Sequence, residues 1–205
     1  MSEQDKQELQ QFEALIQGLI DHQFGCINDF LAPDILAGLR ETLYNLNAFD
    51  GLKSAGIGNN MLLQHNKLVR NDKIHWLEEA ESNHFEKMYL DKIWRFIHYL
   101  NATCYSSIQV FESHYANYEV GSFYKRHIDQ FKSEKGRKFS VILYLNPDWK
   151  EEDGGSLALY PQKGEQINIL PVEGRLVFFK SDEMEHEVYP SLTRERSSIA
   201  GWMKN

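Results

Sequence analysis

SIQVFESHYANY, residues 107–118, opens a series of eight short runs of apolar or alternating residues that are separated by turn-forming residues. Alternation of apolar and polar residues with a period of two is typical of β-strands. Eight such strands in succession predict a sandwich or jelly roll. The other seven runs are FYKRHID (123–129), FSVILYL (139–145), GSLALY (155–160), QINIL (166–170), RLVFF (175–179), HEVY (186–189) and SSIAGWM (197–203).

The residues before this series have mainly helical patterns. Apolar residues recur at helical spacing over 9–20, and a short strand is expected at 26–30. A second helix begins at Pro33, because proline is favoured in the first helical turn, and a third covers 85–100. The second and third helices are separated by residues 50–76, whose glycine-rich beginning predicts a mobile loop.

The length and composition predict one domain over residues 1–205. Of the 205 residues, 42% are hydrophobic, which is enough for a single well-buried core. We expect residues 1–104 to supply mainly helical support and the mobile loop, and residues 105–205 to form the β core. The class expected is therefore mainly β with N-terminal helices.

The charge and the cysteine content restrict the partners and the compartment. A formal net charge of -8 argues against a chain-wide affinity for nucleic acid or an anionic membrane. Cys26 and Cys104 are too few for a disulfide framework, which indicates a reducing interior. The polar N-terminus does not resemble a signal peptide, and no run approaches the roughly 18 apolar residues of a membrane span. We expect a cytoplasmic protein, and a monomer.

Three residues have the spacing of a metal site. His127 and Asp129 lie two positions apart, so on an extended strand their side chains project to the same side. A His-x-Asp pair alone is weak evidence, but His186 follows 57 residues after Asp129 in a second predicted strand. Two imidazoles and one carboxylate, with other positions open, form the arrangement that suits non-heme Fe(II) oxygenases.

Arg196 follows His186 by ten residues and is the predicted anchor for an acidic co-substrate. A short hairpin over 190–193 would return the strand of Arg196 antiparallel to that of His186 and point the guanidinium into the same mouth. Its planar fork can bind a carboxylate through two hydrogen bonds. Arg194 is the alternative, but it lies in the polar turn.

Five segments carry a resemblance to a known family. They resemble the 2-oxoglutarate- and Fe(II)-dependent prolyl 4-hydroxylases, in particular the oxygen-sensing, hypoxia-inducible-factor type and its bacterial relatives. The resemblance implies a double-stranded β-helix (jelly roll) core buttressed by helices, in which His127, Asp129 and His186 bind Fe(II) and Arg196 binds the distal carboxylate of 2-oxoglutarate. The segments are VRNDKIHWLE (69–78), FYKRHID (123–129), ILYLNPDW (142–149), FFKSDEMEHEV (178–188) and RSSIAGW (196–202).

The resemblance also assigns further residues to the co-substrate pocket. Tyr144 matches a strand tyrosine that donates a hydrogen bond to the distal carboxylate. Tyr115 matches a second pocket tyrosine, although it precedes the His-x-Asp pair by two residues more than in the family. Leu157 and Val188 are expected to line the same pocket.

A second group of residues is implied to contact the substrate. Tyr124 matches a tyrosine close to the target proline, and Trp202 is expected to pack beside the iron and the target. Arg70 belongs to the same group. Asp72 and Arg137 match an ion pair that ties the mobile loop to the strand near the metal; a surface pair with little effect on stability is the alternative.

The reaction implied is hydroxylation with Fe(II), 2-oxoglutarate and O2, and with ascorbate as a further cofactor, producing succinate and CO2. A carboxylate at Asp129 favours hydroxylation over halogenation, which needs a small residue there. The long loop over 50–76 favours a polypeptide target, so a protein-embedded proline is expected. By resemblance the partner is a translation elongation factor. Two alternatives remain: an oxygenase of the same fold acting on a free amino acid or small metabolite, and a non-enzymatic metal-binding scaffold.

Overall fold

The computed structural model describes residues 2–56, 68–130 and 136–205. It contains three long helices, and each lies where the sequence predicted one: α1 (Glu3–His22), α2 (Pro33–Ala48) and α3 (His84–Cys104). Side chains cap two of them, since Ser2 accepts a hydrogen bond from the backbone of α1 and Asn83 does so for α3. Two short 3-10 helices are η1 (Glu79–Glu81) and η2 (Glu151–Asp153).

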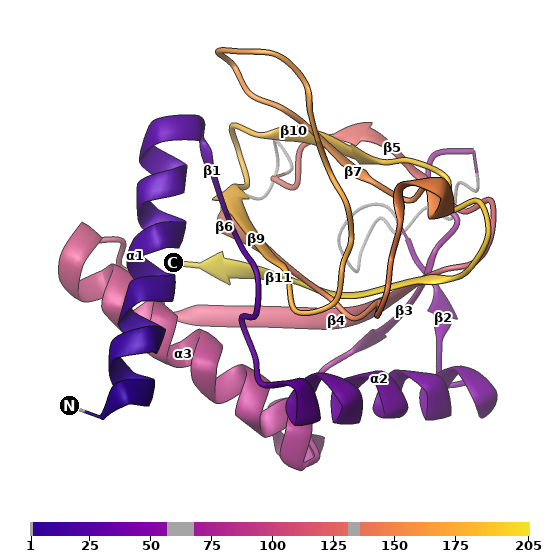
Figure 1. Cartoon of the computed structure of the whole chain (residues 1–205), viewed down its shortest axis with the longest axis horizontal. Coiled ribbons are helices and arrows are strands. Elements are labelled where there is room, and N and C mark those ends of the chain that lie inside the picture. The colour runs from indigo at the N-terminus through magenta and orange to yellow at the C-terminus, as the bar shows by residue number, and fades with distance from the viewer. Residues whose placement is uncertain (1, 57–67, 131–135) are drawn as a thin grey trace.

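The strands form two antiparallel sheets (Figure 1). Within the described residues, the major sheet has seven strands and the minor sheet has four. The major sheet, in spatial order, consists of β1 (Phe24–Ile27), β9 (Leu176–Lys180), β6 (Arg137–Tyr144), β11 (Arg196–Lys204), β4 (Val110–Tyr118), β3 (Lys73–Trp76) and β2 (Lys53–Ser54). The minor sheet consists of β5 (Tyr124–His127), β10 (Glu185–Val188), β7 (Leu157–Tyr160) and β8 (Ile167–Ile169).

The major sheet is covered on both faces. The helices lie on one face, and the minor sheet lies on the other (Figure 1). Each face has its own apolar core: Val141 and Leu143 of β6 pack with the helices, whereas Ile142 and Tyr144 of the same strand pack toward the minor sheet. The alternation of side chains along a strand therefore distributes β6 between two cores.

All eight strands predicted after residue 105 are present, as β4 to β11. The predicted loop over 50–76 is partly wrong, because β2 and β3 lie at its two described ends and β3 pairs with β4. β3 is extended because its backbone forms hydrogen bonds with the edge of β4, and β2 in turn pairs with β3. The middle of that loop, 57–67, lies outside the described residues.

The predicted hairpin between the strands of His186 and Arg196 is also wrong. β10 pairs with β5 and β7 in the minor sheet, whereas β11 pairs with β4 and β6 in the major sheet. The connection crosses from one sheet to the other and is held by hydrogen bonds to the segment around Gly155, whose N–H donates to Pro190 O over 2.9 Å. Arg196 therefore approaches His186 across the space between the sheets.

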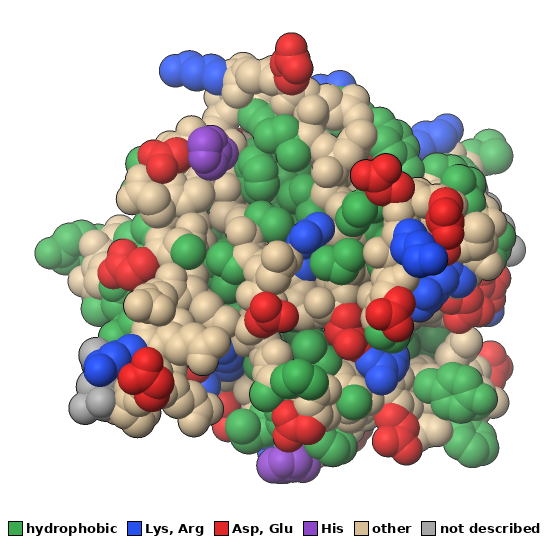
Figure 2. Space-filling view, in the orientation of Figure 1, with side chains coloured by type: hydrophobic (Ala, Val, Ile, Leu, Met, Phe, Trp, Pro, Cys, Tyr) green, Lys and Arg blue, Asp and Glu red, His purple; other side chains and the backbone are tan. Residues whose placement is uncertain are grey.

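The surface carries charged side chains of both signs (Figure 2). Acidic and basic side chains are interspersed on the face seen in Figure 2. Among the helices in the described ranges, none has the length and apolar composition needed to cross a bilayer.

Candidate metal and co-substrate site

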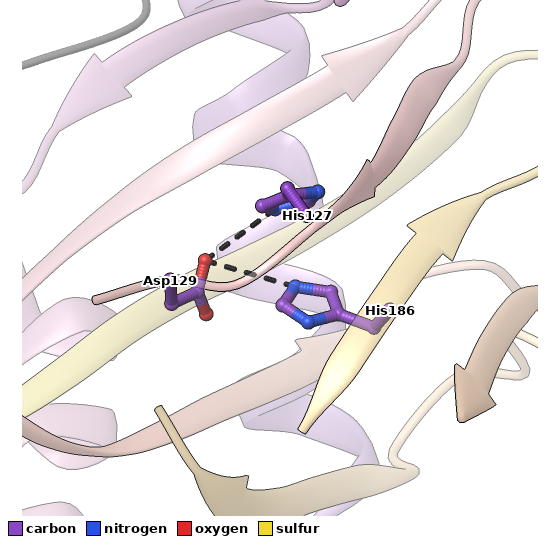
Figure 3. Close-up of side chains that lie close together, drawn as sticks. All are labelled: His127, Asp129 and His186. Carbon is purple, nitrogen blue, oxygen red and sulfur yellow. Dashed lines mark ion pairs between the residues drawn. The ribbon is translucent and has the colours of Figure 1, made fainter. Parts of the chain in front are cut away.

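The minor sheet brings His127, Asp129 and His186 together (Figure 3). His127 of β5 is directly opposite His186 of β10 in the strand pairing. Asp129 Oδ1 lies 3.5 Å from His127 Nε2 and 3.6 Å from His186 Nε2. One ligand atom from each residue lies within 4.8 Å of the others, which is close enough for all three to hold a single metal ion.

Backbone carbonyls orient both imidazoles. His127 Nδ1 lies 2.7 Å from Lys125 O, and His186 Nδ1 lies 3.1 Å from Met184 O. Because a carbonyl oxygen can only accept, each Nδ1 is the donor, and Nε2 is the nitrogen of each ring that faces Asp129. Burial lowers the pKa of His186 to about 4, so this ring is neutral at physiological pH. Both features are those of a metal-binding histidine.

Asp129 lies just past the end of β5, so strand alternation alone does not place its side chain. Ser140 Oγ donates to Asp129 Oδ2 over 2.6 Å, and Arg137 Nη1 donates to the Asp129 carbonyl over 3.2 Å. Burial opposes ionisation, but the neighbouring His186 and His127 outweigh it and hold the pKa of Asp129 well below its usual range. The carboxylate is ionised, and the donor set of two imidazoles and one carboxylate fits Fe(II).

Arg196 enters the same cavity from the major sheet. Its side chain is among the most deeply buried in the described chain, with a relative exposure of 1%. The guanidinium carbon lies 4.9 Å from the ring centre of Tyr118 and 5.0 Å from that of Tyr144. Within the described residues, no Asp or Glu forms an ion pair with Arg196. The alternative anchor, Arg194, instead donates to Pro147 O and does not line the cavity.

Tyr144, Leu157 and Val188 were also predicted to belong to the co-substrate pocket. The Tyr144 hydroxyl is buried beside Arg196 with no hydrogen-bond partner in the described chain, and burial raises its pKa to about 12, so it stays protonated and able to donate. Leu157 and Val188 of the minor sheet line the cavity, as predicted. These groups fit 2-oxoglutarate: a buried cation and an unpaired hydroxyl for its carboxylate, and apolar side chains for its methylenes.

The placement of Tyr115 was wrong. Tyr115 lies on the helix-facing side of β4, where it is fully buried near Glu86 of α3, and burial raises its pKa. Tyr118, three positions later, faces the cavity and pairs with Arg196 in the strand register. Residues three apart on a strand face opposite sides, so only one of the two can line the site. Once Arg196 is known to pair with Tyr118, the alternation of side chains along β4 identifies Tyr118 as the tyrosine that faces the cavity.

The predicted ion pair between Asp72 and Arg137 is not formed. Asp72 is buried and accepts two hydrogen bonds from Arg70, at 2.6 and 2.8 Å. Arg137 instead donates to Glu112 over 3.0 Å and stacks over Trp202, with its guanidinium carbon 3.6 Å from the ring centre. Asp72 is therefore paired within its own segment, with Arg70 two residues upstream, in a bidentate contact.

Aromatic rings form one wall at the mouth of the cavity. His114 of β4 packs against both Trp76 and Trp202, with ring centres 5.0 and 5.3 Å away, and the two tryptophan rings lie 6.2 Å apart. Burial lowers the pKa of His114 to about 3, and its Nδ1 and the Nε1 of Trp202 have no hydrogen-bond partner in the described chain. Sequence reasoning missed His114. His114 could have been found from Tyr118, because residues four positions apart on a strand lie on the same face.

Tyr124 and Arg70 lie beside the metal ligands. The Tyr124 ring stacks on His127 with centres 3.5 Å apart, and Arg70 covers its other face at 4.3 Å. Both line the cavity, as do Trp202 and Arg137, whereas Asp72 does not; contact of these residues with a substrate stays a prediction.

Comparisons with known proteins agree with this geometry. Residues 113–204 match the model of the 2OG-Fe(II) oxygenase superfamily. The chain is 30% identical to a Pseudomonas putida prolyl-4-hydroxylase of known structure, with a TM-score of 0.87 over 95% of this chain and 99% of that one. This chain belongs to the 2OG-Fe(II) oxygenase superfamily, whose members use Fe(II), 2-oxoglutarate and O2.

Further relatives are prolyl hydroxylases of animals. A Trichoplax adhaerens prolyl hydroxylase, solved with a hypoxia-inducible-factor peptide, is 27% identical with a TM-score of 0.89 over 100% of this chain and 93% of that one. The Caenorhabditis elegans hypoxia-inducible factor prolyl hydroxylase is 40% identical over 85 residues, which are 40% of this chain and 12% of that protein. The chain thus matches a small part of this curated relative.

Proposed function

We propose that this chain is a prolyl hydroxylase that acts on a protein substrate with Fe(II) held by His127, Asp129 and His186. The observation that carries the proposal is the guanidinium of Arg196, which is buried in the same cavity as these residues without an acidic partner in the described chain. A buried, uncompensated charge is unfavourable, and a carboxylate of 2-oxoglutarate would neutralise it. Likeness to two prolyl hydroxylases over nearly their whole length supports the substrate class.

The residues of the chain bind and orient the co-substrate and exclude water from it. With Fe(II) bound, the site would supply oxidation of 2-oxoglutarate by O2 to succinate and CO2, with the second oxygen atom entering a C–H bond of the substrate. Arg196 binds the distal carboxylate, and Tyr144 and Tyr118 donate hydrogen bonds beside it. Leu157 and Val188 exclude water from the co-substrate. Asp129 occupies a position that halide would need, which favours hydroxylation.

The substrate binds at the aromatic wall. Trp202 and His114 each have a buried polar nitrogen without a partner in the described residues, and such atoms are found where a ligand completes the hydrogen bonding. Tyr124, held between Arg70 and His127, borders the path from this wall to the metal. An open mouth with polar and aromatic groups suits a peptide segment.

The wider setting of the enzyme is part of the same proposal. Residues 1–205 act as one catalytic domain, as a monomer in the cytoplasm. The first protein to test as substrate is a translation elongation factor, and ascorbate maintains the iron in the reduced form. Neither nucleic acid nor membrane is required as a partner.

Mass spectrometry tests the proposal directly. The Fe(II)-loaded protein, 2-oxoglutarate and O2 are incubated with the proteome of a strain that lacks the protein, and prolines that gain one oxygen atom are identified. His127→Ala should abolish both this product and succinate formation, whereas the exposed His98→Ala should change neither. Succinate formation without any oxidised proline would reject the substrate class. If the wild type never consumes 2-oxoglutarate, the enzymatic proposal itself is wrong.

A further inference from the structure

A double-glycine turn lies against the guanidinium of Arg196. Gly154 and Gly155 connect η2 to β7, and both have positive φ angles, of 69° and 65°. Glycine adopts this region without the steric penalty that other residues incur. The turn is fixed from both sides, because Trp149 Nε1 donates to Gly154 O over 3.0 Å and Gly155 N donates to Pro190 O over 2.9 Å.

Gly155 contacts Arg196 both through its carbonyl and through its missing side chain. Arg196 Nε donates to Gly155 O over 2.9 Å. A Cβ built on Gly155 would lie 3.2 Å from Arg196 Cδ and 3.1 Å from Trp149 Cζ2. Both distances are tighter than ordinary contact, so any side chain here would displace the arginine or the tryptophan.

The hydrogen bond to Gly155 restricts how Arg196 can bind an anion. A guanidinium can receive a carboxylate side-on, through Nε and one terminal nitrogen, or end-on, through both terminal nitrogens. Because Gly155 O already accepts the hydrogen bond from Nε–H, a carboxylate cannot bind side-on through this group. Ser198 Oγ, 3.5 Å from Nη1, is the other hydrogen-bond acceptor of this guanidinium in the described residues and lies at the limit of hydrogen-bond length.

We propose that Gly155 is a positioning residue for the acidic co-substrate. Its carbonyl fixes the guanidinium of Arg196 so that a carboxylate is received end-on, and its lack of a side chain leaves the arginine in that orientation. This inference rests on the proposed binding of 2-oxoglutarate. It also explains the glycine at position 155: the turn must bring a carbonyl to Arg196 without bringing a Cβ.

Gly155→Ala tests the inference by isothermal titration calorimetry on the Fe(II)-loaded protein without O2. Two ligands are compared: 2-oxoglutarate, and pyruvate, which keeps the 2-oxo-carboxylate but lacks the distal carboxylate. The dissociation constant for 2-oxoglutarate should rise by about tenfold or more, the effect of losing one charge-assisted hydrogen bond. The constants for pyruvate and for Fe(II) should stay within about twofold, since this effect acts on the distal carboxylate alone.

Two further variants separate positioning from loss of folding. Gly164→Ala is the matched control, because Gly164 also has a positive φ, of 116°, but a Cβ there would meet nothing within 4 Å. It should lower thermal stability without changing either dissociation constant. Gly155→Asn introduces the same Cβ with a residue that tolerates positive φ better, and should also weaken 2-oxoglutarate if the alanine variant does not fold.

The possible outcomes are distinct. Unchanged 2-oxoglutarate binding in folded Gly155→Ala or Gly155→Asn overturns the inference. Equal weakening of pyruvate and 2-oxoglutarate also overturns it, because the metal side of the site would then be affected. If the wild type binds no 2-oxoglutarate, the proposed function fails instead.

Discussion

Arg196→Met should have opposite effects on the stability of the protein and on its response to 2-oxoglutarate. In the wild type, the guanidinium is 1% exposed and no acidic side chain of the described residues pairs with it. Burying an ion costs several kcal/mol, and apolar replacement of buried charges is often neutral or stabilising by about 1–4 kcal/mol. Methionine loses the hydrogen bond to Gly155, worth about 1 kcal/mol. The free energy of unfolding without co-substrate should therefore stay the same or increase.

The effect of the co-substrate can be estimated from linkage. At a 2-oxoglutarate concentration 100 times the dissociation constant, binding adds about 2.7 kcal/mol to the free energy of unfolding. For a chain of this length, that corresponds to a rise in melting temperature of about 5–11 °C. Removing one partner of a buried charge pair costs about 3–5 kcal/mol, so the dissociation constant of the variant rises by at least about 100-fold. The same concentration then adds only about 0.4 kcal/mol.

Thermal unfolding of the Mn(II)-loaded protein with and without 2-oxoglutarate measures both effects. Arg194→Met is the matched control, because Arg194 contacts Pro147 O and the Trp149 ring away from the cavity. It should keep the wild-type shift. The reasoning is refuted if Arg196→Met keeps the shift or if Arg194→Met loses it.

Three further predictions concern residues around the anchor. Tyr118→Phe should raise the dissociation constant of 2-oxoglutarate by about 2- to 10-fold in calorimetry, whereas Tyr115→Phe should not change it, because Tyr115 faces the helices. Asn146→Ala should lower the free energy of unfolding in urea by about 3 kcal/mol, because three hydrogen bonds to the backbone are lost; the exposed Asn168→Ala should change it by under about 0.5 kcal/mol. Burial lowers the pKa of His114 from 6.5 to about 3, so the unfolded chain binds more protons between these pH values and stability rises with pH there. His114→Gln should reduce this slope by about 1.4 kcal/mol per pH unit between pH 4 and 6 in metal-free protein, and an unchanged slope would contradict the assignment.

The features that could be predicted from the sequence are those that follow from a local pattern of residues. The eight strands of residues 107–203 alternate clearly, and the His-x-Asp pair is read within three residues. The strand partners could not be predicted in this way. A connection from β10 to β11 is compatible with a hairpin or with a crossing between sheets, and alternation is the same in both. The hydrogen bonds that decide for the crossing come from the segment around Gly155, more than thirty residues earlier.

The error at Tyr115 has a different physical cause. Alternation identifies the buried face of a strand only where the other face is exposed. The last six residues of β4 are all buried, because the helices cover one face and the minor sheet covers the other. Tyr115 and Tyr118 are both buried, so burial does not distinguish the face that each of them occupies. Only the pairing of Tyr118 with Arg196 distinguishes them.

The two-sided major sheet also explains how the site is kept in place. Arg196 of β11 and Ser140 of β6 project from its inner face, and Ile199 and Val141 of the same strands are buried in the helical core. His127 and His186 project from the minor sheet toward them. The separation between the two histidine ligands and the carboxylate anchor is therefore set by the packing of the two sheets, and not by a loop. Groups on well-packed strands keep their geometry better than groups on loops. A substitution between the sheets, such as Ile142→Ala, should then alter 2-oxoglutarate affinity without touching either the ligands or the arginine.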